Sequence, residues 1–159
     1  MNTKQMTRWG IGPKFTIISL IYATVVFAIQ DTVFSEVRFI IYSTLINSII
    51  GIVLILIGLI IFFIPAFTID KYFYEGRLCK KGVYAYLRHP IYASWISFIV
   101  PGIVILRGSA LGITIPIFMY IIFRLLIPVE ENYLIDKFGD EYLEYKSKVW
   151  DVFPKLWGK

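Results

Sequence analysis

The sequence contains almost no cysteine or histidine. Among its 159 residues, Cys79 is the single cysteine and His89 is the single histidine. One cysteine excludes an internal disulfide and a cysteine-based metal site, so the redox compartment cannot be read from cysteine usage. One histidine without a paired serine or cysteine makes no catalytic triad and supplies too few ligands for a typical zinc site. We therefore expect no metal.

Charged residues are also scarce. They make up 17% of the chain, whereas hydrophobic residues make up 58%, which lies outside the range of soluble domains. Apolar runs near or above the ~18–20 residues that cross a bilayer recur along the chain. The net charge of +5 lies mostly in the connections, which is typical of membrane topology rather than of nucleic-acid binding. The composition predicts a multi-pass membrane protein in contact with lipids.

The apolar runs predict an all-α bundle in a single membrane domain over residues 1–159, with two spans within 1–69. The first run follows Lys4 and Arg8 and resembles a signal peptide, but we expect it to be a retained span. The second would be ~43 Å long, so it must tilt or extend past the interface. Pro101-Gly102 predicts a kink in the third. The four predicted spans are 15–29, 39–67, 91–106 and 110–129.

The connections between spans indicate an orientation. Spans three and four are joined by only three residues, Arg107 to Ser109, so they form a tight antiparallel hairpin. Arg38 and Arg107 are the only basic residues in the first and third connections, whereas the second carries five. The positive-inside rule then places both termini and the second connection in the cytoplasm, at the cell membrane if the protein is prokaryotic.

The segment after the fourth span changes in composition. Charged residues alternate there with Leu, Ile, Phe and Tyr at helical spacing, and Gly139 interrupts the pattern. This pattern predicts an amphipathic helix over about 140–149 that lies on the membrane surface or on the protein.

Ionisable side chains gather at one predicted depth. Arg88 and His89 precede span three, and Glu130 and Glu131 follow span four. Because the two spans form a hairpin, we expect these four residues to be neighbours. Arg124 lies deeper in span four, where an ionisable residue is a functional candidate by default.

Each of these features has a simpler interpretation. Arg88 and His89 can be an interfacial anchor, the two glutamates a solvated helix end, and Arg124 a snorkelling anchor. The neighbouring aromatic residues can be an ordinary interfacial belt. They are Tyr84, Tyr86, Tyr92 and Trp95.

Four motifs occur in a fixed order over residues 78–155. "GVYAYLRHPIY" is followed by the predicted hairpin, by "EENYL" and by "FGDEYLEYKSKV" with "FP" shortly after. Each piece is weak alone, but the ordered set resembles the isoprenylcysteine carboxyl methyltransferases and the related phospholipid N-methyltransferases. The resemblance implies an integral-membrane enzyme, with residues 70–159 as its cofactor-binding region.

The resemblance also implies a cofactor, S-adenosylmethionine, with S-adenosylhomocysteine as the product. Carboxylates and aromatic faces suit its amino, ribose and sulfonium groups, and Arg88 could meet its carboxylate. A carboxylate acceptor is already nucleophilic, whereas an amine needs a base, for which Glu131 or His89 is a candidate. The positions that match cofactor contacts in the family are Leu78, Cys79, Tyr84, His89, Pro90, Tyr92 and Glu130.

One departure concerns the acceptor. The carboxyl methyltransferases carry an arginine shortly before the acidic pair, thought to hold the substrate carboxylate. Here residues 125–129 read LLIPV, and the nearest arginine is Arg124. We predict either that Arg124 does this work from one turn away or that the lipophilic acceptor is an amine or another lipid.

Two other functions remain open at this point. Membrane sterol reductases have a similar Arg-His pattern and tail but bind NADPH, whose 2′-phosphate calls for basic residues. Here the chain from Glu130 onward holds seven acidic and five basic residues. A non-enzymatic membrane protein would lack a cofactor-sized pocket. Nothing in the sequence indicates the oligomeric state.

Overall fold

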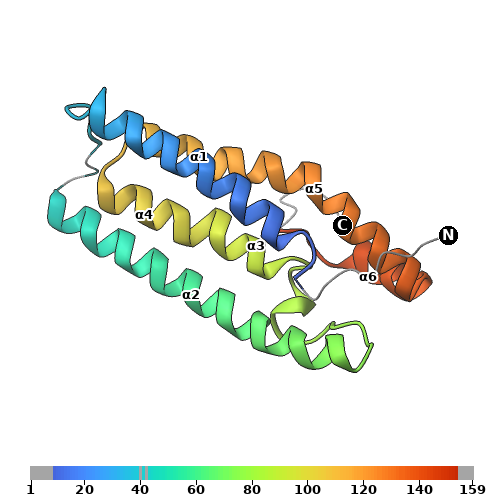
Figure 1. Ribbon diagram of the computed structural model, residues 1–159. Helices are drawn as coiled ribbons and strands as arrows, with labels where there is room; N and C mark the ends of the chain where they lie inside the picture. The colour runs from blue at the N-terminus through green and yellow to red at the C-terminus, as the bar shows by residue number, and fades with distance from the viewer. Residues whose placement is uncertain (1–8, 40, 42, 154–159) are drawn as a thin grey trace.

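The computed structural model describes residues 9–39, 41 and 43–153, and every regular element within them is helical (Figure 1). Four helical segments are long and apolar enough to cross a membrane, which confirms the predicted all-α, four-span architecture. Lys4, Arg8 and Pro154 lie outside the described residues. The elements are α1 Gly12–Thr32, α2 Thr44–Tyr74, η1 Gly82–Ala85, α3 Pro90–Ser94, η2 Trp95–Ile99, α4 Val100–Arg107, η3 Leu111–Ile113, α5 Thr114–Phe138 and α6 Asp140–Lys148.

The second span starts later and ends later than its apolar run predicts. Ser43 caps α2, because its hydroxyl accepts a hydrogen bond from the Ile46 N–H at 3.2 Å. The helix then continues through Pro65 to Tyr74, a length of 31 residues. At the helical rise this is ~46 Å, so α2 is longer than a ~30 Å hydrocarbon core is thick.

The third span is irregular one turn before its Pro-Gly pair. Residues Trp95–Ile99 form a π-helical turn in which the Val100 N–H donates to the Trp95 carbonyl, five residues back. Pro101 has no N–H, and its ring crowds the carbonyl four residues earlier, so a wider turn relieves this contact. The irregularity expected at Pro101-Gly102 is therefore a π-turn just ahead of it.

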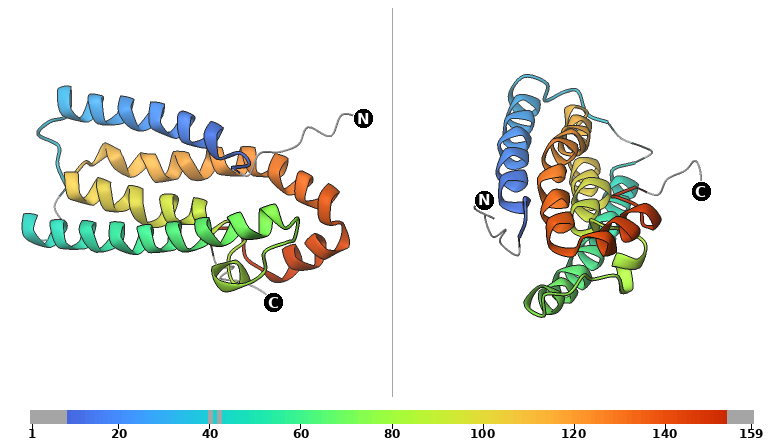
Figure 2. Two further views of the ribbon diagram at one scale, coloured as in Figure 1. Left: turned by 60° about the horizontal axis from the view of Figure 1, so that its bottom comes forward. Right: turned by 90° about the vertical axis from the view of Figure 1, so that its right-hand side faces the viewer.

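The spans pack in two pairs, α1 on α5 and α2 on the α3–α4 span (Figure 1, Figure 2). Two glycines let α2 and α4 approach each other closely. A Cβ at Gly51 would lie 2.8 Å from the Gly102 carbonyl oxygen, and a Cβ at Gly102 would lie 2.8 Å from the Gly51 oxygen. Any side chain at either position would push these two helices apart.

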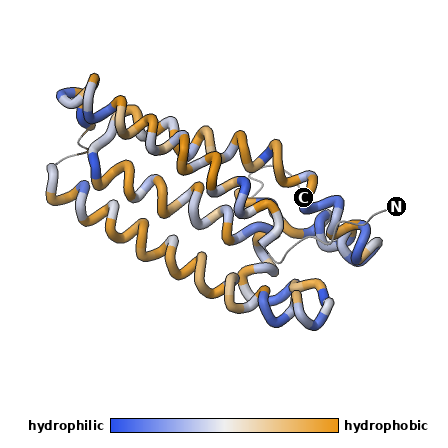
Figure 3. The backbone as a smooth tube through the Cα atoms, in the orientation of Figure 1, coloured by the Kyte–Doolittle hydropathy of each residue, from blue (hydrophilic) through white to orange (hydrophobic). Residues whose placement is uncertain are grey.

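Most of the charged residues lie at one end of the bundle. The start of α1, the end of α2, the segment leading to α3, and α6 lie together there, and Figure 3 shows hydrophilic residues at this end. α5 ends at Phe138, Gly139 takes a positive φ of 55°, and α6 turns back along the bundle. Tyr142 and Tyr145 are buried, so α6 packs on the protein.

Candidate functional site

The segment before α3 is held in place by the C-terminal part of the chain. Residues 87 and 150 form a parallel β-bridge, the Arg88 N–H donates to the Trp150 carbonyl at 2.7 Å, and the His89 N–H donates to the Asp151 carbonyl at 3.3 Å. Pro90 then starts α3, at a helix position that needs no N–H. The backbone hydrogen bond fixes the main chain of His89, and the residue is only 4% exposed, so its ring is closely packed as well.

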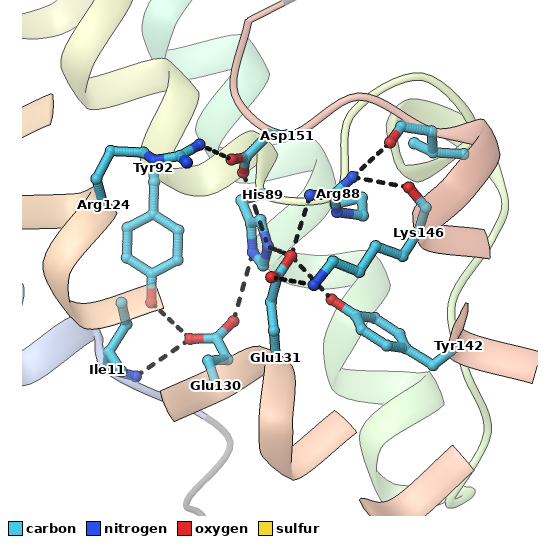
Figure 4. A network of polar contacts seen from close by, with 11 residues as sticks. Ile11, Arg88, His89, Tyr92, Arg124, Glu130, Glu131, Tyr142, Lys146 and Asp151 are labelled. Carbon is cyan, nitrogen blue, oxygen red and sulfur yellow. Dashed lines mark hydrogen bonds and ion pairs between the residues drawn. The ribbon is translucent and has the colours of Figure 1, made fainter. Parts of the chain in front are cut away.

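Glu130 faces the first span and the third. Its Oε2 accepts hydrogen bonds from the Tyr92 hydroxyl at 3.0 Å and from the Ile11 N–H at 3.2 Å (Figure 4). Its Oε1 lies 3.6 Å from His89 Nδ1. One carboxylate oxygen is therefore held by the protein, while the other faces the imidazole.

Glu131 points to the other side and is surrounded by cations. Its Oε1 lies 3.0 Å from Arg88 Nη2 and accepts a hydrogen bond of 3.4 Å from the Tyr142 hydroxyl. Its Oε2 lies 2.8 Å from Lys146 Nζ. The Arg88–Glu131 pair is largely buried, and breaking such a pair by removing one partner costs ~3–5 kcal/mol.

Arg88 also closes the end of α6. Its Nη1 donates to the carbonyls of Lys146 at 3.1 Å and Val149 at 2.6 Å, while its Nη2 reaches Glu131. Only a guanidinium offers this many donors in a fixed plane. One side chain therefore connects the segment before α3 with α5 and α6.

His89 lies among three carboxylates. Besides the Glu130 contact, its Nε2 lies 3.6 Å from Glu131 Oε1 and 4.0 Å from Asp151 Oδ1. Burial alone would lower the pKa of His89, but the facing carboxylates outweigh it and raise the pKa to about 8. The imidazole is therefore mostly protonated at neutral pH.

Arg124 lies apart from this cluster. Its side chain is 58% exposed, and its Nη1 lies 3.2 Å from Asp151 Oδ2. Asp151 thus contacts Arg124 with one oxygen and faces His89 with the other (Figure 4). The ion pair attaches the C-terminal segment to the outer side of α5.

A cavity of about 590 Å³ opens beside His89 and Glu130. Its walls come from the start of α1, the second half of α2, the segment 77–92, the end of α5, and α6. One part carries ionisable and hydroxyl groups, whereas the part between α1 and α2 is apolar and includes Phe15, Ile17, Phe62 and Ala66. Such a site has room for a drug-sized ligand.

The cavity separates the predicted site residues into two groups. All eight residues predicted to bind the cofactor line it, and the two predicted catalytic residues, Arg124 and Glu131, do not. The roles predicted for these two residues stay predictions. The eight lining residues are Leu78, Cys79, Tyr84, Arg88, His89, Pro90, Tyr92 and Glu130.

Sequence reasoning missed several partners of these residues. Ile11, Tyr142, Lys146 and Asp151 contact the glutamates, the histidine or Arg88, and the sequence analysis assigned none of them a role. Tyr142 and Lys146 lie one turn apart on the amphipathic helix, which was a usable signal. The Ile11 contact is made by a backbone N–H and leaves no such trace in the sequence.

Two other chemistries find little support at this site. Within residues 9–39, 41 and 43–153, no group of three or more His, Cys, Asp and Glu side chains could hold a metal ion. Burial raises the pKa of the Cys79 thiol, so this side chain stays protonated and is a poor nucleophile.

A sequence model of the isoprenylcysteine carboxyl methyltransferase (ICMT) family matches residues 52–136, more than half of the chain. The chain belongs to this family. The match covers most of α2, the segment before α3, the α3–α4 span and most of α5. It leaves out residues 9–12 and α6, which contact the same site.

Curated relatives agree with this membership. The chain is 37% identical over 81 residues to the human protein-S-isoprenylcysteine O-methyltransferase, which covers 51% of this chain and 28% of the human protein. It is 42% identical over 73 residues to the protein of that name from Saccharomyces cerevisiae, covering 45% of this chain and 30% of the yeast protein. The chain therefore spans only about a third of the length of such relatives. Neither the reductase nor the non-enzymatic alternative finds support in these relatives.

The fold also matches a solved structure. The structure of the eukaryotic intramembrane Ras methyltransferase ICMT aligns with a TM-score of 0.61 and 21% sequence identity, and covers 98% of this chain and 58% of that one. At this identity the likeness shows a shared membrane fold.

Proposed function

We propose that the cavity binds S-adenosylmethionine and that the protein transfers its methyl group to a lipid-linked acceptor. The observation that carries this proposal is that one cavity is lined by all eight residues predicted to bind this cofactor. Membership of the ICMT family and the curated relatives' names support the same reaction. The predicted product is S-adenosylhomocysteine.

The residues present fit the cofactor. Arg88 and His89 contribute cationic nitrogen groups beside the carboxylate of Glu130. Both side chains line the cavity, together with the carboxylate of Glu130 and the rings of Tyr84 and Tyr92. These groups suit a ligand that carries an ammonium, a carboxylate and a cationic sulfur.

The protein's own part in the reaction is mainly geometric. When bound, S-adenosylmethionine supplies an activated methyl group on a sulfonium. The chain has to align the acceptor with that group and exclude water. Glu130 and His89 orient the ligand, and the buried Arg88–Glu131 pair fixes the wall behind them.

The apolar wall accommodates the acceptor's lipid part. Phe15, Ile17, Phe62 and Ala66 belong to the membrane-spanning helices α1 and α2, so this side of the cavity meets the hydrocarbon region. A prenylcysteine carboxylate is the first candidate, because the curated relatives are named for it. A lipid amine is the second, because residues 125–129 hold no arginine.

A ligand titration tests the cofactor assignment. Calorimetry of the detergent-solubilised protein with S-adenosylhomocysteine should show binding that Glu130→Gln weakens by about tenfold or more, equivalent to ~1.4 kcal/mol. NADPH should not bind. The matched control is Glu144→Gln, an exposed α6 carboxylate that pairs with Lys148 outside the cavity.

The control variant should bind like the wild type. Binding of S-adenosylhomocysteine that is insensitive to Glu130→Gln would contradict the site assignment. Absence of binding by the folded wild-type protein would contradict the cofactor itself.

A further inference from the structure

The turn that precedes α1 contacts the cavity from outside the segment that the family model matches. Residues Trp9 to Gly12 form a tight turn in which the Gly12 N–H donates to the Trp9 carbonyl at 2.8 Å. We call these four residues the N-terminal turn. Trp9, Gly10 and Gly12 line the cavity, and the family match begins only at residue 52.

This turn contacts Glu130 directly. The Ile11 N–H donates to Glu130 Oε2 at 3.2 Å, across 119 residues of sequence. The Tyr92 hydroxyl donates to the same oxygen at 3.0 Å, so Oε2 is held from two sides. Glu130 Oε1 is then directed toward His89 (Figure 4).

Gly10 makes the contact possible. Its φ is +53°, a value that L side chains rarely adopt and that only the primed types of β-turn need at their first central position. A Cβ at Gly10 would also collide with the carboxylate of Glu130. The backbone at residues 10 and 11 can therefore approach the Glu130 carboxylate this closely because residue 10 is a glycine.

We propose that the N-terminal turn is a positioning element of the cofactor site, in which Gly10 and the Ile11 N–H set the orientation of the Glu130 carboxylate. The predicted effect on cofactor affinity rests on the proposed function. The hydrogen bond between the Ile11 N–H and Glu130 does not depend on that proposal. The turn acts through Glu130, so Gly10 and Ile11 are positioning residues rather than catalytic ones. Affinity for the cofactor then depends on a segment outside the family's matched region.

Two glycine variants separate positioning from backbone strain. Gly10→Ala and Gly76→Ala both place a side chain at a positive φ, +53° and +64°, but a Cβ at Gly76 meets nothing within 4 Å. Gly10→Ala should weaken S-adenosylhomocysteine binding by about tenfold, the effect of one lost hydrogen bond to a charged group. Gly76→Ala should bind S-adenosylhomocysteine within about twofold of the wild-type affinity. Its loss of thermal stability should be similar to that of Gly10→Ala, because both variants place a side chain at a positive φ.

A second pair of variants tests the N–H itself. Ile11→Pro removes the donor, and the φ of −81° at this position is compatible with proline. Ile11→Ala keeps the donor but loses the buried side chain. Ile11→Pro should weaken binding well beyond Ile11→Ala. Equal losses in these two variants, or equal losses in the two glycine variants, would overturn the inference.

Hydrogen exchange tests the contact without any cofactor. The Ile11 amide should exchange about tenfold faster in Glu130→Ala than in the wild type, because its acceptor is gone. Unchanged exchange would overturn the inference even if the cofactor binds. Absence of S-adenosylhomocysteine binding by the wild type would instead overturn the proposed function, and the exchange result would still decide whether the turn holds Glu130.

Discussion

His89 combines burial with an excess of negative neighbours. The carboxylates of Glu130, Glu131 and Asp151 all lie within 4.0 Å of its ring nitrogens, and the ring is almost fully buried. Such an environment favours the imidazolium over the neutral ring. One protonated histidine therefore partly compensates the two adjacent acids on α5 and the acid in the C-terminal segment.

This environment predicts a pH-dependent stability. Because the folded pKa of about 8 exceeds the ordinary 6.5, the stabilisation is complete below pH 6.5 and is lost as pH rises through 8. The shift corresponds to about 2 kcal/mol. Thermal unfolding of the wild type and His89→Gln should show a Tm difference that is largest at pH 6 and narrows by pH 9.

The comparison with His89→Gln removes pH effects that the two proteins share. A Tm difference that stays constant between pH 6 and 9 would show that the imidazole does not titrate in this range. A difference that grows with pH would contradict the sign of the coupling.

At the scale of single residues, the sequence motifs contain several of the residues that line the cavity. "RHP" and the following Tyr92 line the cavity with Glu130, as the sequence predicts. The sequence did not predict the groups that hold them. The Ile11 N–H and the Lys146 carbonyl act through the backbone, and backbone groups carry no residue-type signal.

Among the helices, the apolar runs predicted the number of spans correctly but not their ends. α2 starts later than the apolar run because Ser43 caps it. It ends later than the run because its last turns carry polar residues and still remain helical. α5 continues to Phe138 through Pro128, so Glu130 and Glu131 lie about two turns inside the helix. Their charges are balanced by Arg88, His89 and Lys146 rather than exposed at a helix end.

The short hairpin connection was the most informative element-scale feature. Three residues between spans three and four force the spans to be antiparallel neighbours, and this brings residue 88 to residue 131. The position of α6 did not follow from sequence in the same way, because an amphipathic face fits a membrane surface and a protein surface equally well. Burial of Tyr142 and Tyr145 shows that this face meets the protein.

For the molecule as a whole, the arrangement of charge predicts an orientation in the membrane. The end that carries the cavity holds Lys80 and Lys81 with the other basic residues of the second connection, whereas Glu36 lies in the connection at the opposite end. By the positive-inside rule, we predict that the cavity end faces the cytoplasm. A cytoplasmic cavity also has direct access to a soluble cofactor.

Cysteine labelling in intact cells tests this orientation. The native Cys79 is buried, so its background labelling should be low. With a membrane-impermeant maleimide, Glu36→Cys should react in intact cells, and Lys81→Cys should react only after permeabilisation; both positions are exposed. The reverse pattern would contradict a cytoplasmic site.

The central claim is methyl transfer from the cavity to a lipid-linked acceptor. The most direct measurement uses the purified protein in lipid or detergent with methyl-labelled S-adenosylmethionine and two acceptors, a prenylcysteine with a free carboxylate and a lipid with a primary amine. Base lability distinguishes the resulting methyl ester from an N-methyl group. Glu130→Gln and Glu144→Gln serve as the site variant and its control.

The account predicts that label enters one of these lipids, that Glu130→Gln reduces the transfer by about tenfold or more at limiting cofactor, and that Glu144→Gln does not. A base-labile product would identify the carboxylate as the acceptor, and a base-stable product the amine. Transfer to neither lipid by the folded wild-type protein would contradict the account.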